Sequence, residues 1–482
     1  MLDPRPVFYV IGLLVFGLGA SMIAPAMLDA ADGSPHWRSF ALSGTVSVFF
    51  GGALAVACRE QRSAGLSLQQ SFLLTSTAWL ALPLFGALPF VFGEPQARFV
   101  DAFFEAMSGI TTTGSTVFIG LEKLPKGILL WRGMLQWFGG VGIIVFAIAF
   151  LPTLKVGGMQ LFRSEAFDTL GKILPRAVEI AQSIGWIYLG LTAACLIAYT
   201  AAGMTTFEAT VHAMTTVSTG GFANEDASFG VYGAMAEYVA SVFMVLAALP
   251  FIRYVQIVNG SHRPILMDSQ IRTFLAMVAI VVAVLTLYLF LKEESVHEAP
   301  FRKSLFNVVS IMTGTGYAST DYGQWGAFPV VVLILIGLIG GCSGSTTCSI
   351  KVFRYQVLFA AAKAQIRKLR SPHGIFTPRF EGRPIEPEVI SSVMSLLFFF
   401  CIAFGVVSII LSMIGLAPIT AISGAATALA NVGPGIGPEI GPAGNFAKLP
   451  DAAKWVLSFA MFLGRLEILA VLVILTPAFW RG

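Results

Sequence analysis

Apolar runs long enough to cross a membrane alternate along this chain with apolar runs that are too short. The long runs include Val7–Met27, Ser39–Cys58 and Val389–Leu416, and each is long enough as a helix to span a bilayer core of about 30 Å. The short runs contain roughly a dozen residues, or about 18 Å of helix. We therefore predict that the short runs enter the membrane partway and turn back as re-entrant half-helices.

Four short runs end in similar motifs of small residues. The half-helices are predicted at 101–112, 207–218, 303–314 and 420–431. Aligned on one Gly, the motifs are Thr111-Thr112-Thr113-Gly114-Ser115, Val217-Ser218-Thr219-Gly220-Gly221, Thr313-Gly314-Thr315-Gly316-Tyr317 and Ala430-Asn431-Val432-Gly433-Pro434. They recur at intervals of roughly 100 residues, as expected for a repeated unit. The third motif resembles a potassium-channel filter, in which backbone carbonyls replace the water around an ion. Ordinary helix-capping loops are the alternative, but they need not recur at one position.

The repeat predicts an all-α polytopic membrane protein with five segments. These are a two-helix extension at 1–66 and four repeats at 67–165, 166–262, 263–386 and 387–482. Each repeat consists of an outer helix, a half-helix with its pore loop, and an inner helix; the inner helices are predicted at 127–151, 232–258, 325–355 and 452–478. The whole is expected to have ten transmembrane helices and four re-entrant pore loops in a pseudo-fourfold arrangement.

Composition excludes several other classes. The chain is 56% hydrophobic and only 12% charged, whereas soluble proteins are about 25% charged. The first apolar run has no cleavage site after a short core, which favours an anchor helix over a signal peptide. Five cysteines in or beside apolar segments predict neither a disulfide framework nor a zinc site. Phosphate-binding loops and nucleophile elbows are missing, so we do not expect an enzyme.

Charge is distributed unevenly between the predicted loops. Most of the 30 Lys and Arg lie on the side that carries both termini, including Lys351, Arg354, Lys363, Arg367, Lys368 and Arg370. The positive-inside rule therefore predicts cytoplasmic termini and half-helices that enter from outside. The basic connection 351–388 is expected to be cytosolic, partly irregular and available to a partner or anionic lipid. Acidic residues outside, such as Glu225 and Asp226, either concentrate cations or form a plain solvated face.

A run of small residues interrupts the third inner helix. It consists of Gly340, Gly341, Cys342, Ser343, Gly344, Ser345, Thr346 and Thr347. Glycines permit a break in the helix, and Ser and Thr hydroxyls can satisfy the freed backbone groups. Such a break is tolerable only against protein or a water-filled cavity. We predict a gate below the pore loops that is low in packed contacts; a small-residue face for helix packing is the alternative.

Arg465 lies deep in the predicted fourth inner helix. It is about 15 Å of helix from either end, too far for its side chain to reach the headgroups. Its insertion costs roughly 2.5–3.5 kcal/mol or more, so we predict that it faces the pore and opposes cations there. A buried ion pair is the alternative. Glu467 follows two positions later and would point to another face of the helix.

The motifs as a group resemble the superfamily of K+ transporters that includes bacterial Trk and Ktr subunits and plant HKT proteins. The segments that carry the resemblance are Gly140–Gly142, Ser218–Phe222, Gly340–Thr346 and Asn431–Gly435. The resemblance covers essentially the whole chain, and the N-terminal helix pair is similar to the TrkH/TrkG branch. We therefore expect a protein of the TrkH/TrkG type.

The resemblance implies K+ uptake across the bacterial inner membrane, with K+ as the bound and transported ion and no covalent cofactor. It also implies a homodimer, a cytosolic NAD- or ATP-binding regulatory subunit of the TrkA type, no nucleic acid partner, a K+-selective Gly114, and Arg465 under the filter. The implied filter residues are Thr112, Thr113, Gly114, Ser218, Thr219, Gly220, Gly314, Thr315, Gly316, Asn431, Val432 and Gly433.

Several functions stay open on the residues alone. The motifs contain no carboxylate, which by itself favours a monovalent over a divalent cation. A proton- or sodium-coupled symporter, a less selective monovalent cation channel and a membrane enzyme acting on lipid are the alternatives.

Overall fold

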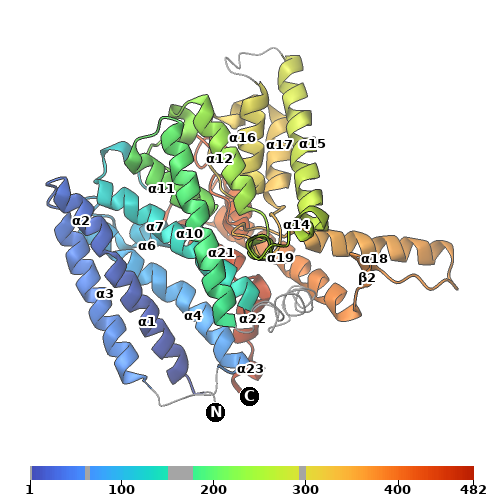
Figure 1. Cartoon of the computed structure of the whole chain (residues 1–482), viewed down its shortest axis with the longest axis horizontal. Coiled ribbons are helices and arrows are strands. Elements are labelled where there is room, and N and C mark those ends of the chain that lie inside the picture. Colours follow the sequence, from blue (N-terminus) through green and yellow to red (C-terminus); the bar gives the residue numbers. More distant parts are fainter. Residues whose placement is uncertain (1–2, 60–65, 150–176, 293–299, 482) are drawn as a thin grey trace.

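The computed structural model describes residues 3–59, 66–149, 177–292 and 300–481, and it is almost entirely helical (Figure 1). Within these residues, seven helices are long and apolar enough to cross a membrane, or up to nine if each of two bent helix pairs is one span. The expected ten spans count the third inner helix as one, whereas the structure divides it into two helices. The predicted end of the first inner helix at Leu151 and the boundary at 165–166 lie outside the described residues.

The N-terminal extension forms a closely packed helix pair. It contains α1 (Arg5–Ser21), its continuation α2 (Ile23–Ala31) and α3 (Trp37–Ala57). Gly12 and Gly51 let the two backbones approach, since a Cβ on Gly51 would lie 2.5 Å from the Phe16 nitrogen. Asp29 at the end of α2 accepts a 2.7 Å hydrogen bond from the Gly127 nitrogen. The pair is thereby joined to the start of the first inner helix.

The outer helices and half-helices lie close to the predicted bounds. The outer helices are α4 (Leu68–Gly86) with the short α5 (Leu88–Phe92), α10 (Ala177–Ala201), α15 (Ser269–Lys292) after the short α14 (Arg263–Met267), and α19 (Pro387–Met413). The half-helices are α6 (Phe99–Ile110), α11 (Thr206–Val217), α16 (Pro300–Met312) and α20 (Pro418–Ala430). Each half-helix is followed by a non-helical segment. These segments begin at Thr111, Ser218, Thr313 and Asn431, and we call them the first to fourth strands.

The inner helices depart from prediction. They are α7 (Lys126–Ala149), α12 (Ala234–Ala247) with α13 (Phe251–Val258), α17 (Ala327–Gly337) with α18 (Val352–Arg370), and α21 (Asp451–Arg465) with α22 (Ile468–Ile474) and α23 (Pro477–Arg481). The expected continuous helices 232–258 and 452–478 are wrong, because the pairs bend by 88° and 104°. Pro250 cannot donate a helical hydrogen bond at the first bend. Glu467 has a left-handed backbone at the second, with φ 58°.

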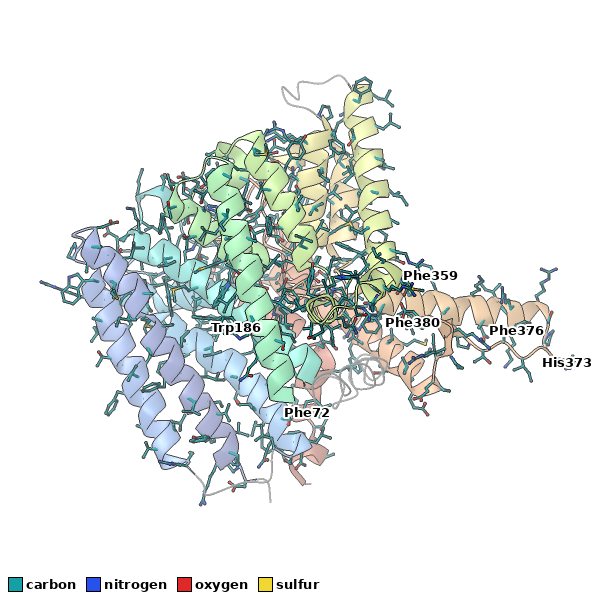
Figure 2. All side chains as sticks on the ribbon, in the orientation of Figure 1. Phe72, Trp186, Phe359, His373, Phe376 and Phe380 are labelled. Carbon is teal, nitrogen blue, oxygen red and sulfur yellow. The ribbon has the colours of Figure 1, made fainter. Side chains whose placement is uncertain are left out.

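The connection 351–388 is more regular than expected. Helix α18 occupies its first half, and a hairpin of β1 (Arg379–Phe380) and β2 (Arg383–Pro384) lies near its end. Together they form an arm that projects from the helical body (Figure 1). Figure 2 shows His373 and Phe376 toward the far end of this arm, with Phe359 and Phe380 nearer the body. Arg354, counted above with the loop charges, is instead buried at the base of α18.

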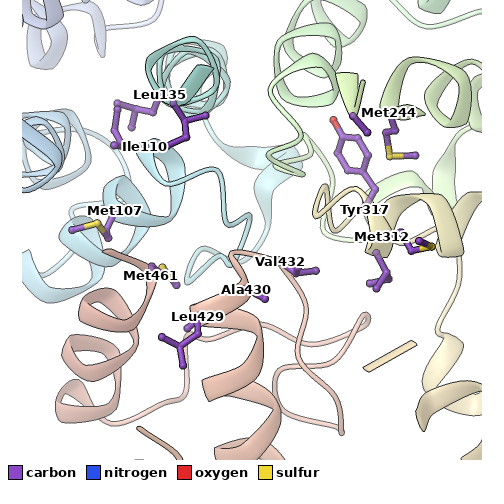
Figure 3. Packing of buried hydrophobic residues seen from close by; sticks show 14 of the residues in the cluster. Met107, Ile110, Leu135, Met244, Met312, Tyr317, Leu429, Ala430, Val432 and Met461 are labelled. Carbon is purple, nitrogen blue, oxygen red and sulfur yellow. The ribbon is translucent and has the colours of Figure 1, made fainter. Parts of the chain in front are cut away.

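The core surrounds the four central strands. Buried apolar residues from all four repeats enclose them in Figure 3, among them Leu135, Met244, Tyr317 and Val432. Short 3-10 helices at Leu121–Lys123 (η1), Ser228–Val231 (η2) and Tyr322–Trp325 (η3) connect three strands to the following inner helices.

The two terminal segments lie at the same end of the molecule (Figure 1). Gln69 donates a 2.8 Å hydrogen bond to the Phe479 carbonyl, and Gln70 donates one of the same length to the Asp3 carbonyl. The start of α4 thus contacts both terminal segments.

Candidate functional site

The chain turns in the same way after each half-helix. The turn is made by one residue with a left-handed backbone: Thr112 (φ 52°), Thr219 (φ 50°), Gly314 (φ 75°) and Asn431 (φ 51°). In three repeats the next residue donates its backbone N–H to the carbonyl five residues earlier, at Thr113, Gly220 and Val432. These turns close the helix ends and release the chain into an extended strand.

The turns fix the register of the second strand, and this register differs from the predicted alignment. Gly221 has the left-handed φ of 82° that Gly114 and Gly316 also have, at 83° and 81°. Gly221, and not Gly220, therefore corresponds to the aligned glycines of the other repeats. The alignment on Gly220 was wrong by one residue, because two consecutive glycines give no side chain by which to choose between them.

The four strands touch one another in cyclic order. A Cβ on these glycines would meet the backbone of the next repeat: Gly114 at 2.3 Å from the Gly220 oxygen, Gly221 at 1.8 Å from the Thr315 oxygen, Gly316 at 2.7 Å from the Gly433 nitrogen, and Gly433 at 3.1 Å from the Thr113 oxygen. Three of these contacts are far too close for any side chain. We call Gly114, Gly221, Gly316 and Gly433 the ring glycines.

The side chains of the strands are turned away into local hydrogen bonds. The hydroxyls of Thr113 and Thr315 each lie 2.7 Å from a second threonine hydroxyl two positions earlier. The Asn431 amide donates to the Thr113 hydroxyl at 3.0 Å and to the Met461 carbonyl at 2.9 Å. The carboxyl ends of the four half-helices lead directly into these strands, and their dipoles favour a cation.

The third strand is braced against the second half-helix. The Tyr317 hydroxyl is hydrogen-bonded to the Thr215 hydroxyl and lies 3.3 Å from that of Thr216. Its ring packs on Phe229, with 4.4 Å between the ring centroids. Ser310 donates to the Tyr317 carbonyl at 2.7 Å. This strand is therefore held from both its own repeat and its neighbour.

Buried ion pairs hold the outer parts of two strands. Arg132 of α7 lies 2.8 Å from Glu105 of α6, and both side chains are at most 1% exposed. Glu105 also accepts a 2.9 Å hydrogen bond from the Val117 nitrogen in the first strand. In the third repeat, Lys303 pairs with Glu237 at 2.8 Å and donates to the Ser319 carbonyl at 2.9 Å. In both pairs, each buried charge has an opposite charge beside it, and one member of the pair also bonds the backbone of a strand.

A hollow outside the ring is lined by the four ring glycines together with Glu225 and Asp226. Asp226 accepts hydrogen bonds from the Gly120 and Leu121 nitrogens at 2.7 and 3.0 Å, so it also supports the first strand's return loop. Burial raises the pKa of Glu225, and the neighbouring carboxylates add to the rise. The carboxylate of Asp226 in this hollow therefore also has a structural role.

The predicted break in the third inner helix is present, since residues between α17 and α18 are not helical. The segment fills the bend of the second inner helix. Cys342 donates its N–H to the Ala248 carbonyl at 3.0 Å, and the Gly344 carbonyl accepts from the Phe251 nitrogen at 2.9 Å. The Thr346 hydroxyl donates to the Ala247 carbonyl at 3.0 Å. Each interruption thus satisfies backbone groups that the other leaves free. A helical packing face does not describe this segment.

Arg465 lies under the first strand, at the end of α21. Its guanidinium contacts the Cys348 thiol and donates to the Gly139 carbonyl at 3.1 Å. The Cys348 sulfur in turn lies 3.4 Å from the Thr112 hydroxyl. Glu467 pairs with Arg354 of α18 rather than with Arg465. A hollow below the ring is lined by Ser345, Cys348, Asn431, Arg465 and Glu467, among others.

Two polar residues of the first inner helix were missed by sequence reasoning. Arg132 and Gln136 are buried and both bond to the second strand, through the Ala223 and Gly220 carbonyls. Their spacing of four places them on one face of an otherwise apolar helix, which is a signal that the sequence does contain.

These observations define a mostly helical membrane protein in which four strands, each following a short helix, meet at the ring glycines. The model of the TrkH family of cation transport proteins matches residues 36–481, and the chain belongs to this family. The membership predicted from the motifs is confirmed.

Named relatives match along the whole chain. The chain is 43% identical to the Trk system potassium uptake protein TrkI of Halomonas elongata, covering 99% of this chain and 97% of the relative. It is 36% identical to TrkH of Vibrio parahaemolyticus and 34% identical to TrkH of Escherichia coli, covering 99% of each chain. The crystal structure of the potassium transporter TrkH from Vibrio parahaemolyticus superposes with a TM-score of 0.91 at 34% identity, over 100% of both chains.

Proposed function

We propose that this chain is the membrane subunit of a Trk-type K+ uptake system in the bacterial inner membrane. The observation that carries the proposal is the cyclic contact of four strands at the ring glycines, which gives a cation carbonyl oxygens and no carboxylate. The names of the full-length relatives give K+ as the ion.

We infer that the strand carbonyls form a selectivity filter. The predicted filter residues stand with one change: Gly221 joins the second strand as the counterpart of Gly114, Gly316 and Gly433. Three of the four contacts at the ring glycines leave no room for a side chain, so the strands pack closely against one another. A filter of this kind discriminates among monovalent ions through the number and placement of its carbonyl dipoles.

The segment Gly340–Thr347 and Arg465 are proposed as the gate. They lie on the inner side of the ring, where an ion leaving the strands would pass. The Arg465 guanidinium places a positive charge beside this path, and the segment Gly340–Thr347 narrows the path. In this proposal the segment moves when α18 moves, since Lys351, which directly precedes α18, donates a 2.8 Å hydrogen bond to the Thr347 hydroxyl.

The partners of the chain belong to the same proposal. We retain the homodimer, a TrkA-like cytosolic subunit that binds NAD or ATP, and cytoplasmic termini. The basic arm formed by α18 supports a cytosolic orientation, because it ends in Arg367, Lys368 and Arg370. The arm is long enough to transmit a movement from the cytosol to the gate.

A coupled symporter is the second candidate. Coupling would need an ionisable group near the path, and Glu467 lines the inner hollow. Glu467 is paired with Arg354, so its carboxylate already has a partner within the protein. The observations therefore favour conduction without coupling.

The proposal is tested by 86Rb+ uptake in a strain that lacks its own K+ uptake, with competition by K+ and Na+. We expect strong competition by K+ and weak competition by Na+. Purified protein in liposomes, with an imposed voltage and no pH gradient, distinguishes the two candidates. Flux under voltage alone supports a channel, whereas flux that requires a pH or Na+ gradient supports the symporter. Equal competition by Na+ would refute the K+-selective filter.

A further inference from the structure

Gln136 of the first inner helix binds the second strand on both sides of its ring glycine. Its amide donates to the Gly220 carbonyl at 2.6 Å, and its own carbonyl oxygen accepts from the Phe222 nitrogen at 3.0 Å. The side chain is fully buried. Gly220 is the residue that makes room for it, since a Cβ there would lie 2.3 Å from the Gln136 carboxamide.

The contact continues along the strand one helical turn away. Arg132 donates to the Ala223 carbonyl at 2.9 Å, and its guanidinium lies 4.2 Å from the centroid of the Phe222 ring. Arg132 is itself held by Glu105. The first inner helix therefore contacts the second strand from Gly220 to Ala223, and these contacts join two repeats.

The bond to Gly220 makes one carbonyl of the ring different from its counterparts. The corresponding carbonyls are those of Thr113, Thr315 and Val432, and among the described residues none of these three has a recorded donor. The Gly220 oxygen keeps the cyclic position, because it lies against Gly114 as the Thr315 oxygen lies against Gly221. It thus belongs to the ring and also accepts a side-chain hydrogen bond.

We propose that Gln136 is a positioning residue that sets ion selectivity through the second strand. This inference rests on the proposed K+-conducting function. A carbonyl that accepts an amide hydrogen has less electron density to offer an ion and less freedom to move toward it. In the ring, the Gly220 carbonyl then binds an ion more weakly and moves less than the other three carbonyls. The relative affinity for K+ and for smaller ions depends on that difference.

Two substitutions separate the two bonds of Gln136. Gln136→Glu keeps an acceptor for the Phe222 nitrogen but loses the donor to Gly220, and Gln136→Met loses both with little change in volume. Trp137→Phe is the matched control: it removes one hydrogen bond from the adjacent residue of α7, to Thr192 on α10, away from the strands. K+, Rb+ and Na+ permeabilities are measured from reversal potentials of the full chain in liposomes.

We expect both Gln136 variants to lower the K+/Na+ permeability ratio by about fivefold, the equivalent of one hydrogen bond, and the control to leave it unchanged. An unchanged ratio with a uniformly lower flux overturns the proposal and leaves Gln136 a structural support. A loss of selectivity in Gln136→Met alone also overturns it, because the Phe222 bond would then be the determinant. If Gln136→Glu does not fold, Gln136→Met tests whether the Gln136 side chain as a whole sets the permeability ratio, and an unchanged ratio in this variant overturns the proposal. A wild-type chain that carries no K+ refutes the proposed function instead.

Discussion

Gly220 and Gly221 are each glycine for a different structural reason. Gly220 has an ordinary backbone and makes room for Gln136, whereas Gly221 has a left-handed backbone and lies against Thr315. The sequence predicted that glycine is needed here but could not say which glycine serves which purpose. That choice depends on the neighbouring helix and strand, which are distant in sequence.

Substitution of a ring glycine is expected to disturb selectivity. Gly114→Ser adds a Cβ that would lie 2.3 Å from the Gly220 oxygen, at a left-handed φ that side chains rarely adopt. The strands must then separate, and we predict a K+/Na+ permeability ratio at least about tenfold lower; Gly221→Ala is expected to do the same. Gly190→Ala is the control, since a Cβ there meets nothing within 4 Å. An unchanged ratio in folded Gly114→Ser contradicts the filter assignment.

Arg465 was predicted as a buried cation facing the path, and its position under the first strand is consistent with that role. Arg465→Ala removes the positive charge and the side-chain hydrogen bond to the Gly139 carbonyl. We expect a higher K+ flux per molecule, measured by stopped-flow uptake into liposomes, while thermal unfolding in detergent shows a folded protein. A variant that does not accumulate in the membrane would favour a purely structural role. Trp79→Leu, which removes only the ring beside the guanidinium, separates packing from charge.

At the scale of elements, the half-helices were predictable and the bends of the inner helices were less so. Short apolar runs, each followed within a few residues by Gly, located α6, α11, α16 and α20 closely, because a helix of this length cannot span a bilayer. Pro250 was a visible signal for the first bend, though proline is tolerated in many membrane helices. Glu467 gave no such signal. Its left-handed backbone accompanies a pairing with Arg354, and such a long-range contact cannot be read from local sequence.

The segment between α17 and α18 is held more firmly than its composition suggested. Seven of its eight predicted gate residues, all except Gly344, are buried, and its hydrogen bonds reach the bend of the second inner helix. Opening of such a gate therefore requires the hydrogen bonds to the second inner helix to break, or that helix to move with the segment. A regulator acting on α18 would have to supply the free energy of several hydrogen bonds, about 1 kcal/mol each.

Deletion of Gly341–Thr347 is expected to raise K+ flux and weaken dependence on the cytosolic partner, because the inner path loses its obstruction. Thr346→Val is a milder variant that removes only the hydroxyl bonded to Ala247, and we expect a smaller rise. Thr286→Val is its control, since the Thr286 hydroxyl has no hydrogen-bond partner among the described residues. A folded deletion variant with wild-type flux in the liposome assay would exclude the gate.

At the scale of the whole molecule, two interfaces between repeats use the same ion pair with opposite polarity. Glu237 and Lys454 are each the fourth residue of their inner helix, α12 and α21. Lys303 and Asp101 lie equally far before the ring glycines Gly316 and Gly114. Glu237 pairs with Lys303 at 2.8 Å, and Lys454 pairs with Asp101 at 2.6 Å. The positions correspond, and only the signs are exchanged.

The repeat was predictable from its period, but this exchange of charge was not, because each pair joins residues of different repeats. The correspondence suggests that an inner helix can carry either sign here if the next half-helix carries the other. Breaking a buried pair on one side costs about 3–5 kcal/mol, whereas an exchanged pair keeps the Coulomb attraction.

The reversed pair Glu237→Lys with Lys303→Glu is therefore expected to be more stable than either single reversal, because it restores opposite charges, as between Lys454 and Asp101. It should remain less stable than the wild type, because it loses the Lys303 bond to the Ser319 carbonyl and the Glu237 contact with Arg302. Either reversal alone places two like charges in a buried interface, and we expect it to lower the thermal unfolding midpoint strongly or to prevent accumulation. The measurement is thermal unfolding of the purified chain in detergent, together with K+ uptake. Reversal of the exposed pair Lys126–Asp32, whose side chains are 50% and 39% exposed, is the control and should leave the unfolding midpoint nearly unchanged. A double variant no more stable than the single reversals would mean that the two interfaces are not interchangeable.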